Sequence, residues 1–522
     1  MSGQGLKRVM TSLSAAPSGR LAGAFSKLID GLCDPQRRRR VMLAVAAAYG
    51  AAWFIYGLIA KSSQDINADL AEMTVWAHEP ALGYPKHPPL LAYVVRAWFA
   101  VFPQADWGFL LLAALTLAAG LYLAFELCGL WLDGEKRATV PFLLAVIPFY
   151  NFLGLKFDQN SALIPLWALA MLAFMRSLET RRAGWGIVLG IAAAAAMLTK
   201  YWSFFLLAAI LLALIFDHRR NAYLRSPAPW SGAAVFLCLT LPHLFWLIEN
   251  HFPPLNWLGE RRTASSVLDF IRSLNEYSFG TLGYVAPAIV LVALFVRPAG
   301  KAVRDSWFVM EPSRRPATLL FWTPLLLPIP VAMAKHTNLL SVWNEPSVAL
   351  LPVMMLASPL IKVSRRAVAW IAACAVTYTV LALIASPFVA FVLLERGVEN
   401  NAAYAKLLAA ATERQWRETT DKPLALVGGR FLLANPVAFY MADKPSTYSD
   451  FYSYLSPWAT PERVARGMAI VCEPDDGFCL GMIKRYLTAS RGGRQSEVTL
   501  TRHWLGLPDA PHRFVIATMP PQ

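Results

Sequence analysis

The sequence predicts a mainly α-helical protein that crosses a membrane many times and ends in a small α/β domain. Of its 522 residues, 57% are hydrophobic and only 16% are charged, which lies outside the range of an ordinary soluble domain. The apolar residues are gathered into runs close to the roughly 20 residues needed to cross a bilayer. These runs stop after residue 394. The pattern therefore predicts a polytopic helical bundle followed by one soluble domain.

The membrane bundle is predicted to contain about eleven spans. Pro141 and Pro148 interrupt one of these segments, and "TKYW" at 199–202 separates two others that otherwise form one long kinked helix, so the count stays open by one or two. The segments are 41–60, 106–130, 138–155, 159–176, 184–199, 201–216, 230–248, 279–296, 317–334, 345–361 and 367–394.

The basic residues predict how the chain is oriented in the membrane. The sequence has 48 Lys and Arg against 33 Asp and Glu, and the basic residues form short clusters between apolar runs instead of the aromatic-interleaved stripe typical of nucleic-acid binding. The clusters fall on alternate connections, which the positive-inside rule places in the cytoplasm. Residues 1–40 then form a cytoplasmic basic N-terminus and 41–394 the membrane domain. The loops 61–105 and 249–278 and the domain 395–522 lie on the outer side.

The C-terminal domain shows the signals of a small α/β fold. Short β-rich runs, "PLALVG", "VAFYMA", "GMAIVC" and "RFVIATM", alternate with helical or Pro- and Gly-bearing segments. "GGR" at 428–430 is interpreted as a strand-ending turn, because two glycines are weak evidence for a phosphate loop. Cys472 and Cys479 are either free or joined, since an oxidising exterior permits a disulfide across their short spacing. Metal binding is disfavoured because histidine is absent nearby.

The first outer loop contains an unusual concentration of polar groups, "DLAEMTVWAHEPALGYPKHPPL" at 69–90. If the chain is helical over residues 65–78, one helix face contains Asp65, Asp69, Glu72 and Trp76. Neighbouring carboxylates raise the pKa of one of them, which suits a carboxylate that accepts a proton. The alternative is a solvated helix face beside the lipid headgroups.

The end of this stretch, "GYPKHPPL", predicts a rigid turn. Its consecutive prolines break the helix and hold Lys86 and His87 ahead of the amphipathic segment "LAYVVRAWFAVF". A carboxylate, an ammonium and an imidazole are thereby brought close together. With this loop the sequence resembles the family 39 group of integral-membrane glycosyltransferases with the C-type fold, which includes protein O-mannosyltransferases and the lipid A aminoarabinose transferase. Their first outer loop carries Asp-Glu followed by His-Pro-Pro-Leu.

The resemblance extends in order over residues 65–394. "KFDQN" at 156–160 is similar to the family's Pro-Asp segment, "LTKYW" to its Leu-Ser/Thr-Lys-Tyr segment, and "VWNEP" to its Trp-x-x-Pro loop. Two positions depart from the family pattern. Leu70 stands where the family has the second acid of its pair, which leaves Glu72 one turn on as the substitute, and Phe157 replaces a frequent proline.

The resemblance implies transfer of a sugar from a polyprenyl-phosphate carrier to an acceptor hydroxyl at the outer face of a bacterial inner membrane, with the C-terminal domain in the periplasm. Asp69 would be the general base of an inverting single displacement, with Glu72 as a second acid, and Asp158 would orient the acceptor or the sugar. The donor phosphate would be bound by Lys200, Lys86, Arg261 and Arg262. The substrates would be positioned by His87, Tyr84, Tyr201 and Trp343.

Each charged candidate also has a structural interpretation. The alternative for Lys200, at a helix end, is that its side chain only extends to the membrane interface. The alternative for Asp158 is that it caps the helix that starts at 159. The outer-side histidines, His87, His243, His251 and His336, show no metal-ligand spacing. We therefore predict no required cofactor and no metal, although a divalent ion is compatible with the resemblance.

The expected partners are a polyprenyl-phosphate-linked sugar, a glycolipid or protein acceptor and the lipid bilayer, but no nucleic acid. A bacterial envelope glycolipid is favoured as acceptor because the short tail resembles the bacterial branch. The alternative function is a transporter or flippase, since prolines and polar residues near span ends also occur there. The spans show no inverted repeat and their charges collect at one face, which counts against it. A structural subunit is a third possibility, in which Asp69 has no catalytic role.

Overall fold

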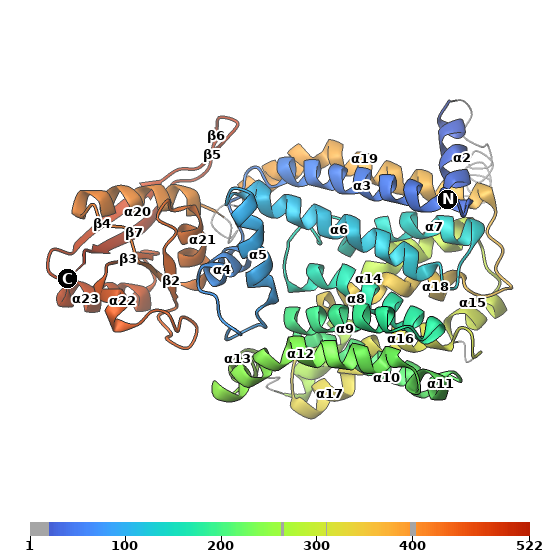
Figure 1. Ribbon diagram of the computed structural model, residues 1–522. Coiled ribbons are helices and arrows are strands. Elements are labelled where there is room, and N and C mark those ends of the chain that lie inside the picture. Colours follow the sequence, from blue (N-terminus) through green and yellow to red (C-terminus); the bar gives the residue numbers. More distant parts are fainter. Residues whose placement is uncertain (1–19, 263–265, 309–310, 397–402, 522) are drawn as a thin grey trace.

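The computed structural model describes residues 20–262, 266–308, 311–396 and 403–521. It consists of a helical bundle with an α/β domain attached to one end (Figure 1). Among the described residues, seven helices are long and apolar enough to cross a membrane. They are α3 (Arg38–Ala60), α6 (Asp106–Cys128), α8 (Gln159–Thr180), α12 (Pro227–Glu249), α14 (Val267–Phe295), the pair α16 (Arg315–Leu326) and α17 (Pro328–Lys335), and α19 (Arg365–Glu395). The predicted helical membrane fold is confirmed.

The four other predicted spans are also helical but are short or broken. They correspond to α7 (Gly134–Ala145) with η1 (Pro148–Tyr150), α9 (Ala183–Thr199), η2 (Tyr201–Ser203) with α10 (Phe204–Ile215), and η3 (Ser341–Leu350) with α18 (Leu351–Leu356). Pro148 begins the separate turn after α7, and Lys200 in an extended conformation separates α9 from η2. The number of spans, predicted as about eleven, stays a prediction.

The remaining bundle helices lie at its two ends. Figure 1 shows α2 (Arg20–Cys33), α11 (Arg220–Leu224) and α15 (Gly300–Trp307) at the end away from the α/β domain, and α13 (Pro253–Arg262) at the opposite end. Several predicted basic clusters lie at the first of these ends, including the arginines at the start of α3 and in α11. The site described below lies at the other end.

Small residues allow α9 and α12 to pack closely. A Cβ atom at Gly186 would collide with the carbonyl oxygen of Ala228, and one at Gly190 would collide with that of Gly232. Apolar helices gain little from hydrophobic burial inside a bilayer, so close backbone approach at small residues is a main source of their association. This packing fixes the first half of α9 against α12.

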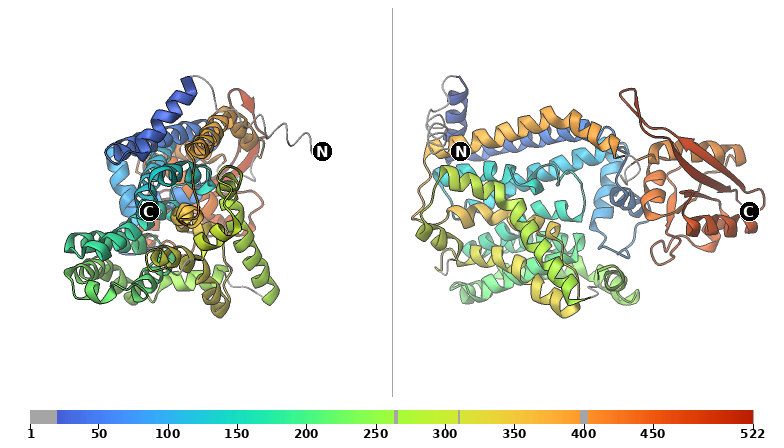
Figure 2. Two further views of the ribbon diagram at one scale, coloured as in Figure 1. Left: turned by 90° about the vertical axis from the view of Figure 1, so that its right-hand side faces the viewer. Right: turned by 180° about the vertical axis from the view of Figure 1, so that it is seen from behind.

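Two short helices form a layer between the bundle and the α/β domain. They are α4 (Ala68–His78) and α5 (Leu90–Val101), and both Figure 1 and Figure 2 place α4 against the α/β domain. The side chain of Asn67 caps α4 by accepting the N–H of Asp69 at 3.0 Å. The prediction of a helix starting at residue 65 is wrong, because Asp65 precedes this cap and accepts the N–H of Lys406 at 2.9 Å.

The C-terminal domain contains a five-stranded mixed sheet in the order β2-β1-β3-β7-β4. Strand β1 (Leu426–Gly429) pairs in parallel with β2 (Ser446–Ser449) and β3 (Met468–Cys472), whereas β7 (His512–Met519) runs antiparallel to β3 and β4 (Arg494–Leu500). The helices are α20 (Ala405–Thr419), α21 (Phe431–Tyr440), α22 (Pro461–Ala465) and α23 (Gly477–Ala489). A small hairpin, β5 (His503–Trp504) with β6 (Leu507–Pro508), completes it.

The sheet confirms three of the four predicted β-rich runs and corrects one. "VAFYMA" lies mostly in helix α21, not in a strand. Val437 and Ala438 of this helix pack into the domain core beside β1 and β3, while Phe439 packs against the membrane domain. Burial on both sides explains a continuous apolar run, which resembles a strand when it is read by composition alone. "GGR" is a strand-ending turn, as predicted, since Arg430 follows β1 and is the N-cap residue of α21.

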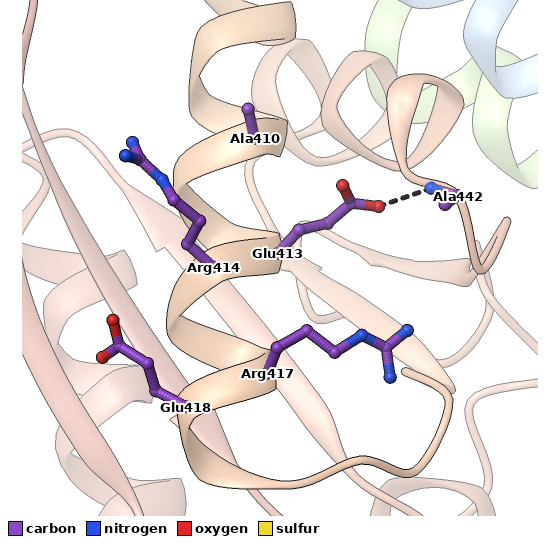
Figure 3. A pocket seen from close by; sticks show the side chains of 6 residues that line it. All are labelled: Ala410, Glu413, Arg414, Arg417, Glu418 and Ala442. Atoms are coloured by element: carbon purple, nitrogen blue, oxygen red, sulfur yellow. Dashed lines mark hydrogen bonds between the residues drawn. The ribbon is translucent and has the colours of Figure 1, made fainter.

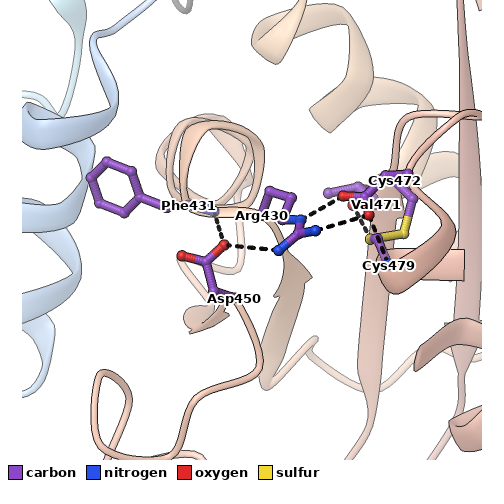
Figure 4. Close-up of a disulfide and its surroundings, with 7 residues drawn as sticks. Arg430, Phe431, Asp450, Val471, Cys472 and Cys479 are labelled. Atoms are coloured by element: carbon purple, nitrogen blue, oxygen red, sulfur yellow. Dashed lines mark hydrogen bonds and ion pairs between the residues drawn. A yellow bond between two sulfur atoms is a disulfide. The ribbon is translucent and has the colours of Figure 1, made fainter. Parts of the chain in front are cut away.

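Cys472 and Cys479 form a disulfide between the end of β3 and helix α23 (Figure 4). The question left open by the sequence is therefore settled in favour of the bridge. The Asp476 carboxylate lies inside the closed loop, caps α23 by accepting the N–H of Cys479 at 3.0 Å and forms an ion pair with Arg430. The bridge thus constrains the loop that holds Arg430.

Replacing both Cys472 and Cys479 by serine is expected to destabilise the C-terminal domain. A disulfide that closes so short a loop stabilises by roughly 2 to 3 kcal/mol through the entropy of the unfolded chain. Thermal unfolding of the full chain, followed with a probe in this domain, should shift to lower temperature, and a reductant should shift wild type in the same direction. An unchanged transition would contradict the expectation.

Candidate active site at one end of the bundle

A carboxylate–ammonium–carboxylate row lies where α4 meets the start of α8. Lys156 Nζ contacts Asp69 Oδ2 at 2.6 Å and Asp158 Oδ2 at 3.8 Å. The Asp69 side chain is 48% exposed, so a substrate is able to reach it. Burial disfavours the charge on Lys156, but the carboxylates of Asp69 and Asp158 outweigh it and raise its pKa. Lys156 therefore stays protonated between two acids.

Asp158 also caps helix α8, as its structural interpretation predicted. Its Oδ1 accepts the N–H groups of Asn160 at 2.8 Å and Ser161 at 3.2 Å, and the Ser161 hydroxyl accepts the N–H of Asp158. The other oxygen faces Lys156. Because the cap uses one oxygen only, the structure leaves the second available to the site.

Lys200 is held by groups from two other segments. Its Nζ donates to Asn160 Oδ1 at 2.5 Å and lies 5.0 Å from the centre of the Trp343 ring. The Trp343 ring in turn packs against Trp202 at 4.9 Å. The ammonium is thus directed toward the start of α8, next to the carboxylate row, and three of the predicted family motifs meet at this point.

Lys86 and Glu72 form a buried ion pair. Lys86 Nζ lies 2.7 Å from Glu72 Oε1, and each side chain is little exposed. Burial raises the pKa of Glu72 while Lys86 opposes this shift. The geometry makes Glu72 the counter-ion of Lys86, whereas Asp69 has Lys156 as its partner. A second catalytic role for Glu72 stays a prediction.

The turn that contains His87 is anchored by aromatic packing. The His87 ring meets the Trp76 ring edge-on, with 6.1 Å between the ring centres. The Tyr84 ring stacks on the Trp76 ring, with 4.9 Å between the ring centres. Burial, together with the charges of Lys200 and Lys86, lowers the pKa of His87 to about 3. The imidazole is therefore neutral at physiological pH, which makes it a hydrogen-bonding group and not a cation.

The two predicted tyrosines are engaged within the protein. The Tyr84 hydroxyl donates to the carbonyl oxygen of Trp76 at 2.8 Å. The Tyr201 hydroxyl pairs with His243 Nε2 at 2.9 Å, and His243 Nδ1 lies 2.6 Å from the carbonyl oxygen of Leu82. These contacts tie the outer loop to α12. Contact of either tyrosine with substrate stays a prediction.

Arg261 and Arg262 are the last residues of α13, and their side chains lie outside the described part of the structure. Their predicted contact with phosphate stays a prediction. Among the described residues there is no group of three or more His, Cys, Asp or Glu suited to a metal ion. The expectation that no metal is required is not tested by this observation.

Sequence reasoning missed three charged residues near the row. Lys156 stands in the quoted "KFDQN" segment, two positions before the acid that was singled out. Lys61 directly follows α3, and burial and the charge of Lys156 lower its pKa to about 8. Glu345 lies in "VWNEP", where it is 5% exposed and its Oε1 has no hydrogen-bond partner among the described residues. Polar residues inside or next to apolar runs were the available signal for all three.

The C-terminal domain also contributes to the site. The ring of Phe431, at the start of α21, lies 3.9 Å from Lys86 Nζ. Figure 4 shows Arg430 and Phe431 beside Asp450, and the N–H of Phe431 bonds to Asp450 Oδ1 at 3.2 Å. Arg430 contacts Asp450 and also forms an ion pair with Asp476. Direct contacts therefore link the disulfide loop, through Arg430 and Asp450, to Phe431 and Lys86.

Replacing Phe431 by alanine is expected to weaken use of the donor. A partly buried cation–π contact is worth about 1 kcal/mol, and its loss frees the Lys86 ammonium that we expect to bind phosphate. KM for a lipid-linked sugar should rise about five-fold with little change in kcat, whereas tyrosine should preserve the wild-type value. Equal KM values for the alanine and tyrosine variants would contradict this role.

A surface hollow of about 640 Å³ lies away from this row, along α20 (Figure 3). Three of its four charged lining residues have partners within the domain: Glu413 accepts the N–H of Ala442 at 2.5 Å, Arg417 pairs with Asp443 at 2.6 Å, and Glu418 pairs with Arg494 at 2.5 Å. We do not assign it to the active site.

The chain is similar to known membrane glycosyltransferases. Residues 86–246 match the model of the family described as dolichyl-phosphate-mannose-protein mannosyltransferase. The structure of ArnT from Cupriavidus metallidurans bound to undecaprenyl phosphate is 15% identical, has a TM-score of 0.56, and aligns over 91% of this chain and 97% of its own. The resemblance to family 39 membrane glycosyltransferases is thereby confirmed, and the ArnT likeness establishes the fold.

The chain is also similar in sequence to two curated proteins, both from Rhizobium johnstonii. The lipid A galacturonosyltransferase RgtD is 25% identical over 236 residues, which cover 44% of this chain and 49% of RgtD. The lipopolysaccharide core galacturonosyltransferase RgtB is 28% identical over 271 residues, covering 49% of this chain and 53% of RgtB. The matches span about half the length of these relatives.

Proposed function

We propose that this protein transfers a sugar from a polyprenyl-phosphate-linked donor to a hydroxyl of lipid A or of the lipopolysaccharide core, at the periplasmic face of the bacterial inner membrane. The observation that carries the proposal is the row Asp69–Lys156–Asp158, which lies beside Lys200 at the same end of the bundle. A base within reach of substrate and cations next to it are what transfer from a phosphate-linked sugar requires.

In the proposed reaction Asp69 acts as general base. Its Oδ2 is bonded to Lys156, and its Oδ1 accepts the proton of the acceptor hydroxyl. The acceptor oxygen forms a bond to the anomeric carbon while the bond from that carbon to the phosphate oxygen breaks, so the configuration is inverted and the polyprenyl phosphate leaves with both electrons. Lys156 keeps the carboxylate oriented, which is a positioning role.

Lys86 and Lys200 are proposed to compensate the charge of the departing phosphate. Both ammonium groups are held in place by protein contacts before substrate binds, Lys86 by Glu72 and Phe431 and Lys200 by Asn160. Cations placed in advance stabilise developing negative charge without reorganisation during the reaction.

We further propose that the transferred sugar is a hexuronic acid, because both curated relatives are named as galacturonosyltransferases. Lys61 suits such a sugar, since it forms no ion pair within the described residues and lies near Lys156 at the end of α3. A sugar carboxylate would pair with it. The alternative of a transporter has no specific observation in its favour, and the polar groups lie at one end of the bundle instead of its middle.

Mass spectrometry of envelope lipids tests the proposed function. Cells that lack the gene should lose one hexuronic acid from lipid A or from the core oligosaccharide, and the wild-type gene should restore it. Loss of a neutral sugar would overturn the proposed donor but not the proposed reaction. An unchanged set of glycolipids would overturn both.

The proposed orientation has its own test. In a variant whose free cysteines are replaced by serine, a cysteine at Asp421 of the C-terminal domain should react with a membrane-impermeant maleimide from the periplasm. A cysteine at Arg220, in the basic connection of α11, should react only after the inner membrane is opened, because the positive-inside rule places it in the cytoplasm. Labelling of Arg220→Cys from the periplasm would contradict the orientation.

A further inference from the structure

The β5–β6 hairpin stands apart from the body of the C-terminal domain. Figures 1 and 2 show it extending sideways from the sheet, at the level where α3 and α19 end, beyond the outline of the bundle. Its pairs are His503 with Pro508 and Trp504 with Leu507, so Leu505 and Gly506 form the tip. The hairpin makes no part of the site described above.

Hydrogen bonds fix the height of the hairpin against the membrane helices. Trp504 Nε1 donates to the Ser62 hydroxyl at 2.8 Å, two residues beyond the end of α3. The Arg502 guanidinium, 7% exposed, donates to the carbonyl oxygens of Ser63 at 3.2 Å and Leu394 at 2.8 Å. Leu394 is the penultimate residue of α19. The base of the hairpin is therefore bound to the ends of two membrane helices.

These contacts place the hairpin at the bilayer surface. Helix α3 has 23 residues, and a helix of that length spans about 35 Å, slightly more than the roughly 30 Å of hydrocarbon. Ser62 lies directly past its end. A group hydrogen-bonded to Ser62 thus lies at the level of the headgroups and the adjoining acyl chains.

The tip is apolar and unusually exposed. Leu505 is 84% exposed and Leu507 46% exposed, and Pro508 beside them is also exposed. Leu505 has a φ of 49° and Gly506 a φ of 83°. Two-residue hairpin turns of this kind favour Asn or Gly, and a leucine in the left-handed region costs about 1 kcal/mol. In water nothing offsets the backbone strain or the exposure of the leucine, whereas burial of its side chain in lipid is favourable.

The membrane helix that the base of the hairpin contacts also exposes large apolar side chains. On α19, whose end the hairpin contacts, Ile384 is 71% exposed and Phe388 is 68% exposed. Exposed apolar side chains of this size on a membrane helix face acyl chains. Tryptophan beside leucine is typical of segments that bind at the boundary between headgroups and acyl chains.

We propose that the tip of the β5–β6 hairpin inserts into the adjacent lipid leaflet and holds the C-terminal domain on the bilayer surface. The partner is the phospholipid itself, bound through Leu505 and Leu507 with Trp504 at the headgroup boundary. This anchoring is independent of the reaction proposed above. It would keep α21, and with it Phe431, from rotating away from Lys86.

A fluorescent label on the tip tests the insertion. The free cysteines of the full chain are replaced by serine, Leu505→Cys is labelled with an environment-sensitive dye, and the protein is placed in phosphatidylglycerol/phosphatidylethanolamine nanodiscs. The matched control is Arg491→Cys, an exposed position in the turn between α23 and β4 near the C-terminus. At position 505 we expect a blue-shifted emission and quenching by lipids spin-labelled high on the acyl chain, several-fold stronger than at position 491.

Each outcome decides the proposal. Emission at 505 equal to that of the control, or quenching only by headgroup spin labels, would overturn insertion. Leu505→Asp with Leu507→Asp provides a second measurement, because aspartate is unfavourable in lipid but suits a solvent-exposed turn. In this double variant a protease should cut the hairpin several-fold faster than in wild type in nanodiscs, and equally fast in both proteins if the tip does not insert.

Discussion

Replacing Asp69 by asparagine is expected to reduce transfer by on the order of 10²-fold or more, the usual effect of removing a general base. Asparagine is nearly isosteric, and its side-chain oxygen is able to keep the contact that Lys156 makes with Oδ2 in wild type. Expression, membrane insertion and the position of α4 should therefore be preserved. The loss should appear in kcat at saturating donor, because the change removes proton acceptance and not substrate binding.

Asp65→Asn is the matched control for this variant. It changes an acid of the same loop, and Asp65 accepts the N–H of Lys406 instead of facing the row of Lys156. It should retain transfer within a few-fold of wild type. Near-normal turnover of purified Asp69→Asn would show that the general base lies elsewhere, and it would revive the interpretation of this protein as a structural subunit.

Lys200→Ala is expected to have the second largest effect. If Lys200 binds the donor phosphate, its loss should lower kcat/KM by roughly 2 to 3 kcal/mol, which corresponds to about 30- to 150-fold. Arginine should rescue only in part, because a planar fork presents its donors differently from an ammonium. The measurement is initial rate against the concentration of lipid-linked sugar.

Lys200→Gln separates phosphate binding from a structural role. Glutamine keeps a donor for Asn160 but carries no charge. If the lysine only joins α9 to the start of α8, glutamine should restore activity. If it binds phosphate, the glutamine variant should be nearly as impaired as the alanine variant while its thermal unfolding matches wild type. Silent alanine and glutamine variants would instead indicate a snorkelling lysine.

The sequence was sufficient for features that depend on local patterns. Apolar runs located the helices, the consecutive prolines located the turn of Lys86 and His87, and the break before Tyr201 followed from Lys200 within an apolar segment. Asp158 as a helix cap was also accessible, because capping involves only the next three residues.

What the sequence did not predict depends on packing between distant segments. Lys156 and Asp69 are 87 positions apart, so their ion pair has no local signal. The same holds for the contact between Lys86 and the Phe431 ring, because it depends on the packing of the C-terminal domain against α4. "VAFYMA" was assigned to a strand because burial on both sides removes the helical period from the sequence.

Transfer by the purified protein tests the central claim most directly. Wild-type protein in detergent is mixed with a polyprenyl-phosphate-linked hexuronic acid and a lipid A or core acceptor, and the product is analysed by mass spectrometry and by NMR of the new glycosidic bond. We expect a product of inverted anomeric configuration from wild type and from Asp65→Asn, and little from Asp69→Asn. Retained configuration would contradict direct displacement, and no product with any lipid-linked donor and acceptor, from protein shown to be folded, would contradict the glycosyltransferase mechanism itself.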